Sequence, residues 1–377
     1  MISKRLKLFK LFGFQVSIDV SWFLLVALIT WSLASGVFPN YFPNLSTASY
    51  WLMGFAGAMG LFLSVITHEF AHSIVARSHG MPMRGITLFV FGGVAEMEEE
   101  PPSPQVEFRM AVVGPVTSIV AGGVFYGLAV LLRQGGLPGA VWGVLFYLGL
   151  INGALALFNM IPAFPLDGGR VLRSLVWRSE KQDLISATRI TSTIGRAFAF
   201  LLIGFGVFNL FLGNFIGGMW WFIIGLFLNN AAQASFSQVY IRKYLEGQKV
   251  SRFMKQNPVT VPSSATVRDL VENYIYRYHY KMFPVVDDGE LKGCVTTKQL
   301  SDVDKEEWDT RTVAELASRC GRENTVSPDS DAPGVLQQMR RNGQSRMMVT
   351  EGGRLVGIIT LKDLLEYVST RAELERH

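Results

Sequence analysis

The stretch WLMGFAGAMGLFLSVITHEFAHSIVA, residues 51–76, decides the architecture of this chain. It is apolar and carries no charge before its histidines, so it predicts a helix that crosses a lipid bilayer. His68 and His72 are four residues apart and therefore share one helix face, where both can bind one metal ion. Glu69 can hold a water molecule and take its proton. Ionisable residues are costly in a membrane and usually mark function, so we predict a metal site; a chance motif of hydrogen-bonded histidines is the alternative.

The composition describes a membrane part joined to a soluble part. The chain has 377 residues, of which 49% are hydrophobic and 17% are charged, and its mean hydropathy is +0.28. Its net charge of +5 comes from residues 1–244, because the rest is nearly balanced. A basic surplus in membrane loops reflects topology, so we expect no nucleic-acid partner. Cys294 and Cys320 both lie in the charged part, which predicts a reducing compartment and no structural disulfide.

Six apolar segments predict a polytopic α-helical membrane protein with about six transmembrane helices. They cover about residues 18–37, 51–77, 108–132, 139–161, 193–213 and 215–238. The first segment lacks the A-x-A-like site of a cleaved signal peptide, so we expect it to be a transmembrane helix. Lys and Arg gather in the first ten residues, in 170–196 and after the sixth segment. The positive-inside rule then predicts a multi-pass protein of the cell membrane with both termini in the cytoplasm.

A second motif, NMIPAFPLDGGR, covers residues 159–170 at the end of the fourth segment. Its prolines and glycines predict irregular backbone, which is tolerated at membrane depth only where it lines a cavity. The predicted topology presents Asp167 on this unwound chain at about the depth of His68 and His72. Catalytic zinc usually takes three protein ligands and keeps one position for water, and these three residues make such a set. The alternative for Asp167 is a turn residue before Gly-Gly.

Together the two motifs resemble those of the site-2 protease family of intramembrane zinc metalloproteases. The resemblance extends to Gly92-Gly93 and Gly114-Pro115 and covers about residues 10–240. It implies one Zn²⁺ per chain and a substrate that is a single-span membrane protein, cleaved in or near its transmembrane segment within the lipid bilayer. The family's site residues carry over to five positions: zinc ligands at His68, His72 and Asp167, the general base at Glu69, and an amide that binds substrate or oxyanion at Asn159.

The stretch RGITLFVFGGVA, residues 84–95, is β-branched and aromatic around a glycine pair, which predicts a short hairpin or re-entrant loop beside the site. An exposed edge there would take the substrate as an added strand; a packed loop is the alternative. Acidic residues follow and predict a solvated cytoplasmic turn: Glu96, Glu98, Glu99 and Glu100.

The charged part after Glu246 contains an internal repeat. Residues 283–300, FPVVDDGELKGCVTTKQL, align with residues 347–364, MMVTEGGRLVGIITLKDL, and seven positions are identical. Each copy reads as alternating strands and helices, and the pair resembles soluble α/β tandem CBS domains. We therefore predict a membrane domain at 1–244 and CBS domains at 245–308 and 309–377.

The CBS resemblance implies an adenine nucleotide as ligand, held by a Thr or Ser followed three residues later by Asp. Thr360 and Asp363 keep this pattern in the second copy, whereas the first has Thr296 with Gln299. A neutral amide weakens the case for a nucleotide in the first copy. The alternative is a purely structural pair that forms a homodimer.

Two other classes of function remain open. A CBS-regulated membrane channel or transporter would also join apolar helices to such a tail, but it would leave H-E-x-x-H unexplained. A catalytically inactive relative that binds substrates would have lost a ligand or the base, and none of these residues is missing.

Overall fold

A computed structural model describes residues 5–11, 13–89, 92–97, 100–179, 183–321 and 323–374. The chain divides into two compact units, Met1–Val239 and Tyr240–His377. The domain boundaries at residues 244 and 308 stay predictions. Both cysteines are free thiols.

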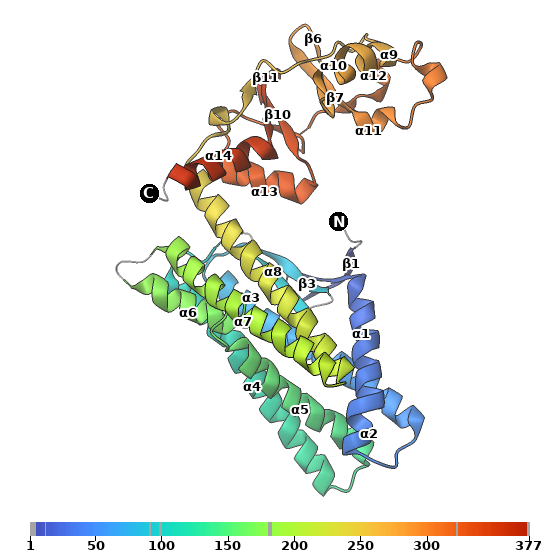
Figure 1. The fold of residues 1–377 in the computed structure, drawn as a ribbon, viewed down its shortest axis with the longest axis vertical. Coiled ribbons are helices and arrows are strands. Elements are labelled where there is room, and N and C mark those ends of the chain that lie inside the picture. The colour runs from blue at the N-terminus through green and yellow to red at the C-terminus, as the bar shows by residue number, and fades with distance from the viewer. Residues whose placement is uncertain are drawn as a thin grey trace. The chain divides into compact units, whose positions relative to one another are not determined.

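Within the described residues, six helices of the chain are long and apolar enough to cross a membrane, which confirms the predicted number (Figure 1). The first candidate span consists of α1 (Ser21–Ser32), the π-helical turn η1 (Leu33–Val37) and α2 (Phe38–Tyr41). The other five are α3 (Thr47–Ser78), α4 (Pro104–Gln134), α5 (Gly139–Asn159), α7 (Leu184–Phe211) and α8 (Phe215–Leu245).

The fifth candidate span begins nine residues earlier than predicted, at Leu184 instead of residue 193. Asp183 caps this helix, because its side chain accepts a hydrogen bond from the Ser186 amide. Thr188 and Thr191 are polar but buried, and their hydroxyls donate to carbonyls one turn back in the same helix. These polar residues lower the hydropathy of the first turns of α7, so the predicted start of the helix was too late.

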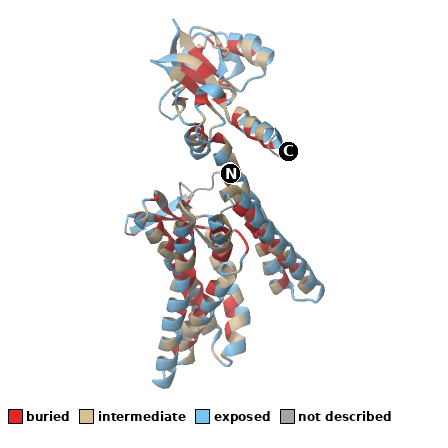
Figure 2. Cartoon of the chain, turned by 90° about the vertical axis from the view of Figure 1, so that its left-hand side faces the viewer, coloured by how far each residue is buried: buried red, intermediate tan, exposed pale blue. Residues whose placement is uncertain are grey.

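The burial pattern of the first unit is that of helices that face lipid. Its helices carry both buried and exposed residues along their length (Figure 2). Large apolar side chains such as Leu201 and Phe211 are 71% and 88% exposed. In water such exposure would be unfavourable, whereas a bilayer solvates it.

A four-stranded sheet in the first unit has the order β1-β2-β3-β4. Its strands are β1 (Arg5–Leu11), β2 (Phe14–Asp19), β3 (Met83–Phe89) and β4 (Gly92–Met97). β3 and β4 are antiparallel, which confirms the predicted hairpin, and β2 pairs with β3 in parallel. Val90 and Phe91 at its tip lie outside the described residues, as do Glu98 and Glu99 of the predicted acidic turn.

The strands β1 and β2 were not predicted. In β2 the buried apolar residues Phe14, Val16 and Ile18 alternate in the sequence with the polar residues Gln15, Ser17 and Asp19, which is the period of a strand. These strands overlap the basic N-terminus and the first apolar segment, so the sequence pattern did not separate them from those two features.

The second unit is a mixed α/β fold, as predicted for tandem CBS domains. Its sheet has the order β6-β7-β11-β10-β9, with β5 on β11 and β8 on β7. The hairpins β6–β7 and β10–β11 contain the two copies of the repeat, and each copy has its own apolar core. The strands are β5 (Lys255–Gln256), β6 (Met282–Asp287), β7 (Glu290–Thr296), β8 (Ser318–Arg319), β9 (Thr325–Val326), β10 (Arg346–Glu351) and β11 (Arg354–Thr360). The helices and helical turns are η2 (Val250–Arg252), α9 (Val267–Asp269), η3 (Leu270–Ile275), α10 (Tyr276–Tyr278), α11 (Thr297–Leu300), η4 (Lys305–Glu307), α12 (Val313–Leu316), α13 (Ala332–Asn342) and α14 (Leu361–Leu374).

Candidate metal centre

Helix α3 carries His68 and His72 into the interior of the first unit. Ser46 caps the helix by accepting a hydrogen bond from the Ser49 amide, which satisfies one of the free donors at a helix start. His68 is 3% and His72 is 9% exposed. Their Nε2 atoms are 3.2 Å apart, so the i, i+4 spacing aims both at one point, as predicted.

Asp167 reaches the same point from the first turn of helix α6 (Asp167–Arg178). The chain between α5 and α6 folds back so closely that a Cβ at Gly168 would collide with the Met160 carbonyl, and one at Gly169 with the Phe164 backbone. The glycine pair is therefore required by close packing. The prediction that Asp167 lies on unwound chain is wrong: it is the first residue of α6, where the helix dipole favours a carboxylate.

The three donor atoms have the mutual spacing that a zinc ion requires. The Asp167 Oδ2 atom lies 3.0 Å from the His68 Nε2 atom and 3.3 Å from the His72 Nε2 atom. Donors at ~2.0–2.1 Å from a tetrahedral zinc ion lie ~3.3–3.4 Å from one another. Within the described part of the chain, these three residues form the one cluster of His, Cys, Asp and Glu with metal-binding spacing.

The protonation states also fit a metal. The Nδ1 atom of His68 is 2.9 Å from the Ser118 hydroxyl, and that of His72 is 2.6 Å from the Met110 carbonyl oxygen. A proton on each Nδ1 leaves the Nε2 lone pairs free for the ion.

Glu69 lies on the same helix as the two histidines. Its carboxyl group interacts electrostatically with His72, His68, Asp167 and Arg170. One residue along a helix turns the side chain by about 100°, so Glu69 borders the cluster without duplicating a ligand position. Its role as the base is a proposal that we argue below.

Gly114 of α4 gives the ion room. A Cβ at this position would collide with the His72 Nε2 atom and lie 2.7 Å from the His68 Nε2 atom. The missing side chain leaves open the space in which an ion would contact both histidines. The residues present therefore fit zinc.

We expect Gly114→Ala to weaken zinc binding by at least about tenfold, because the added methyl group displaces both imidazoles. Gly123→Ala in the same helix is the matched control, since nothing lies within 4 Å of a Cβ there. The measurement is zinc content of the purified full chain after dialysis against a chelator. Equal zinc retention in the two variants would contradict this assignment.

Asn159 is the last residue of α5, and its amide donates to the Leu155 carbonyl at 3.1 Å. Among the described residues, no hydrogen bond joins Asn159 to the three donors, so its predicted role stays a proposal.

A buried ion pair next to the site was missed by sequence reasoning. The Arg173 guanidinium lies 2.5 Å from Glu107 and 3.1 Å from Glu100, and it stands over the Phe164 ring at 4.9 Å. Arg173 and Glu107 are 2% and 1% exposed. This pair links α6, which starts at Asp167, to α4, and no local pattern distinguishes it in the sequence.

In the second unit, Asp363 lies beside a pocket of about 760 Å³. Its Oδ2 atom accepts hydrogen bonds from the Thr360 amide and hydroxyl, and its Oδ1 atom lies 3.4 Å from the Lys255 Nζ atom. The pocket is lined by Lys255, Tyr280, Ser345, Arg346, Thr360, Leu361, Lys362, Asp363, Leu365, Glu366 and Ser369.

The corresponding amide of the first copy is fully used in local structure. The Gln299 Oε1 atom accepts from the Thr296 amide and hydroxyl, at 2.8 and 2.7 Å. Its Nε2 atom donates to the Leu316 carbonyl at 2.8 Å and to the Ser318 hydroxyl at 2.7 Å. Both ends of the Gln299 amide are thus engaged in local hydrogen bonds, and the preference of a nucleotide for the second copy stays a prediction.

A bundle of apolar helices that buries a cluster of metal-binding side chains defines a membrane-embedded metalloenzyme. Comparison with known proteins agrees. Residues 56–141 and 137–202 match the model of peptidase family M50, and residues 250–306 and 313–370 each match a CBS domain. The chain is 34% identical to Rip3 of Mycobacterium tuberculosis, a provisionally assigned zinc metalloprotease, over 94% of this chain and 91% of that protein. It is 29% identical to the zinc metalloprotease MJ0392 of Methanocaldococcus jannaschii, over 97% and 96% of the two chains.

Two solved structures each match one part of the chain. A site-2 protease from Methanocaldococcus jannaschii matches with 28% identity and a TM-score of 0.43, over 61% of this chain and 94% of that one. The CBS domain of a bacterial CNNM/CorC family Mg²⁺ transporter in complex with ATP matches with 25% identity and a TM-score of 0.32, over 35% and 94%.

The chain belongs to peptidase family M50, the site-2 proteases, and carries a tandem CBS pair. It is thus a zinc metalloprotease with several membrane-spanning helices, and the predicted family, fold class and enzyme class are confirmed.

Proposed function

We propose that the protein hydrolyses a peptide bond in or near the transmembrane segment of a single-span membrane protein, with His68, His72 and Asp167 as zinc ligands. The observation that carries the proposal is the convergence of three donor atoms, 3.0 to 3.3 Å apart, inside a unit built of candidate membrane spans. A soluble substrate would have no path to such a site, whereas a substrate already in the bilayer would.

The chemistry divides between the ion and two side chains. When bound, zinc polarises a carbonyl and acidifies water. Glu69 accepts the proton of the attacking water and then gives it to the leaving amide nitrogen. Asn159 binds the substrate backbone or the developing oxyanion, for which its amide must leave the Leu155 carbonyl.

The orientation that we propose has both termini in the cytoplasm of the cell membrane. Helix α3 ends at Ser78, ten residues beyond His68, which corresponds to ~15 Å at 1.5 Å per residue. Under the positive-inside rule, that end faces the cytoplasm. Water then reaches the site from the cytoplasmic side, and cleavage releases a cytoplasmic fragment.

Co-expression tests this function. The full chain is expressed with a panel of single-span membrane proteins that carry a cytoplasmic epitope, and the released fragment is detected in the soluble fraction. We expect release from at least one of them, loss of release with the chelator 1,10-phenanthroline, and recovery with added zinc. Release that resists the chelator would contradict the proposal.

The edge of the small sheet is the proposed docking place for the substrate. β4 is the last strand in the order β1-β2-β3-β4, so one of its edges has no strand partner among the described residues. A substrate segment paired there would be extended, as hydrolysis requires, and held by backbone hydrogen bonds. Disulfide crosslinking between cysteines placed in β4 and in a substrate tests this contact.

We also propose that one adenine nucleotide binds the CBS pair, at the pocket beside Asp363. The Oδ1 atom of the Asp363 carboxylate lies beside Lys255, and that oxygen can accept hydrogen bonds from ribose hydroxyl groups. The Gln299 amide has both ends engaged, which argues for one site per pair. A homodimer without ligand is the competing arrangement.

We expect Asp363→Ala to weaken AMP or ATP binding by more than about tenfold, because hydrogen bonds to a charged group contribute ~1.5–3 kcal/mol. Gln299→Ala is the matched control, since it removes the same capping contacts to a threonine from the other copy. The measurement is calorimetry on the full chain in detergent micelles. Binding that is unchanged in Asp363→Ala, or that is lost in both variants, would contradict a site at Asp363.

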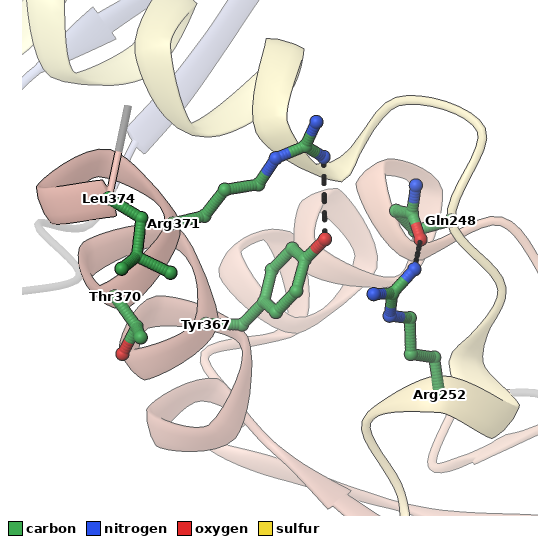
Figure 3. Close-up of a pocket in the computed structure, with 6 residues that line it drawn as sticks. All are labelled: Gln248, Arg252, Tyr367, Thr370, Arg371 and Leu374. Atoms are coloured by element: carbon green, nitrogen blue, oxygen red, sulfur yellow. Dashed lines mark hydrogen bonds between the residues drawn. The ribbon is translucent and has the colours of Figure 1, made fainter. Parts of the chain in front are cut away.

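A second pocket in this unit supplies a further control (Figure 3). Two arginines flank Tyr367: Arg371 donates to its hydroxyl at 3.3 Å, and Arg252 lies 5.2 Å from its ring. A phosphate group could bind such arginines without using Asp363. Because the proposed site is the pocket beside Asp363, which Arg252 does not line, we expect Arg252→Ala to leave nucleotide affinity unchanged.

A further inference from the structure

Helix α4 presents three residues, each four apart, to the two histidines of α3. Ser118 contacts His68, Met110 contacts His72, and Gly114 lies between them against both rings. Residues four apart share one helix face, and the order of contacts shows that the two helices run antiparallel here. This face of α4 therefore contacts both imidazoles and orients them.

The two supports differ in kind. His72 is oriented by a backbone carbonyl oxygen, which exists whatever residue occupies position 110. His68 is oriented by the hydroxyl of Ser118, a side chain that is 2% exposed. The orientation of His68 thus depends on one atom that a substitution can remove.

The direction of this hydrogen bond follows from the donor set. His68 Nε2 points at Asp167 and is the atom that would bind an ion, so its lone pair must be free. The proton of the neutral imidazole then resides on Nδ1, which donates to the Ser118 oxygen. Without that acceptor, the ring loses both its preferred tautomer and its fixed orientation.

We propose that Ser118 is a positioning residue of the metal centre, which sets the tautomer and orientation of His68 and thereby the affinity for zinc. The proposal rests on the proposed ligand set. Partners of this kind typically change metal affinity by about 10–100-fold when they are removed.

The test measures zinc affinity of the purified full chain in detergent micelles by competition with a chromogenic chelator. We expect Ser118→Ala to bind zinc about 10–100-fold more weakly, and Ser118→Thr, which keeps the hydroxyl, to bind within about threefold of wild type. Ser73→Ala is the matched control: Ser73 is also buried and adjoins His72, but its hydroxyl donates to the Glu69 carbonyl of its own helix. Its zinc affinity should not change.

Cobalt substitution adds a readout that a packing role would not move. The visible spectrum of bound Co²⁺ reports ligand geometry, so Ser118→Ala should shift it and Ser73→Ala should not. Wild-type affinity and spectrum in Ser118→Ala, or equal loss in Ser118→Ala and Ser118→Thr, would overturn the proposal. Wild-type zinc affinity in His68→Ala would instead show that the proposed ligand set is wrong.

Discussion

Asp167→Ala is expected to reduce bound zinc from about one ion per chain to almost none, as strongly as His72→Ala does. Each substitution removes one of three protein ligands, and two ligands do not make a catalytic zinc site. The close packing of Gly168 and Gly169 against the preceding loop fixes the start of helix α6, whose first residue is Asp167. Elemental analysis of the purified full chain measures the effect.

Asp183→Ala is the control for this experiment. Asp183 also stands at the start of a helix, where it caps α7, but it is exposed and lies outside the cluster. It should keep wild-type zinc content. If Asp167→Ala also keeps it, Asp167 is only the first residue of helix α6 and the third ligand lies elsewhere.

Glu69→Gln is expected to keep its zinc yet lose cleavage by at least about a hundredfold, because a positioned general base typically contributes 10²–10⁴-fold. The amide has nearly the same size as the carboxylate but cannot accept the proton of water. Zinc content and fragment release are measured on the same preparations, with the exposed Glu272→Gln as control. Wild-type turnover in Glu69→Gln would exclude Glu69 as the base.

The histidine pair was predictable because its geometry is local. Two residues four apart in a helix must share a face, and the uncharged run before them fixed the helix. The prediction of Asp167 as the third ligand required only the order of the membrane crossings, since the second and fourth segments end on the same side of the membrane. The sequence was wrong about the local backbone at Asp167, because helix α6 starts at that residue instead of after it.

The supports of the site could not be predicted, because they depend on tertiary packing. Ser118 and Met110 are 50 and 38 residues from the histidines that they contact, and nothing in one sequence links them. The buried pair of Arg173 and Glu107 spans 66 residues. Gly114 carried a signal only through the resemblance, and its function became visible once its missing side chain was seen against both histidines.

That a nucleotide prefers the second CBS copy stays a prediction, made from one residue difference. The structure adds that the Gln299 amide group donates to Leu316 and Ser318, residues 17 and 19 positions away. These contacts to a backbone carbonyl and a side-chain hydroxyl depend on tertiary packing, which an alignment of the two repeats does not show.

The most direct test of the account is to map the cleavage sites themselves. Membranes from cells that express wild type or Glu69→Gln are compared by labelling of newly formed N-termini and mass spectrometry. The account predicts wild-type-dependent N-termini inside, or within a few residues of, the transmembrane segments of single-span proteins, and none of them with Glu69→Gln. Identical sets of N-termini from the two strains, or new termini confined to soluble proteins, would contradict it.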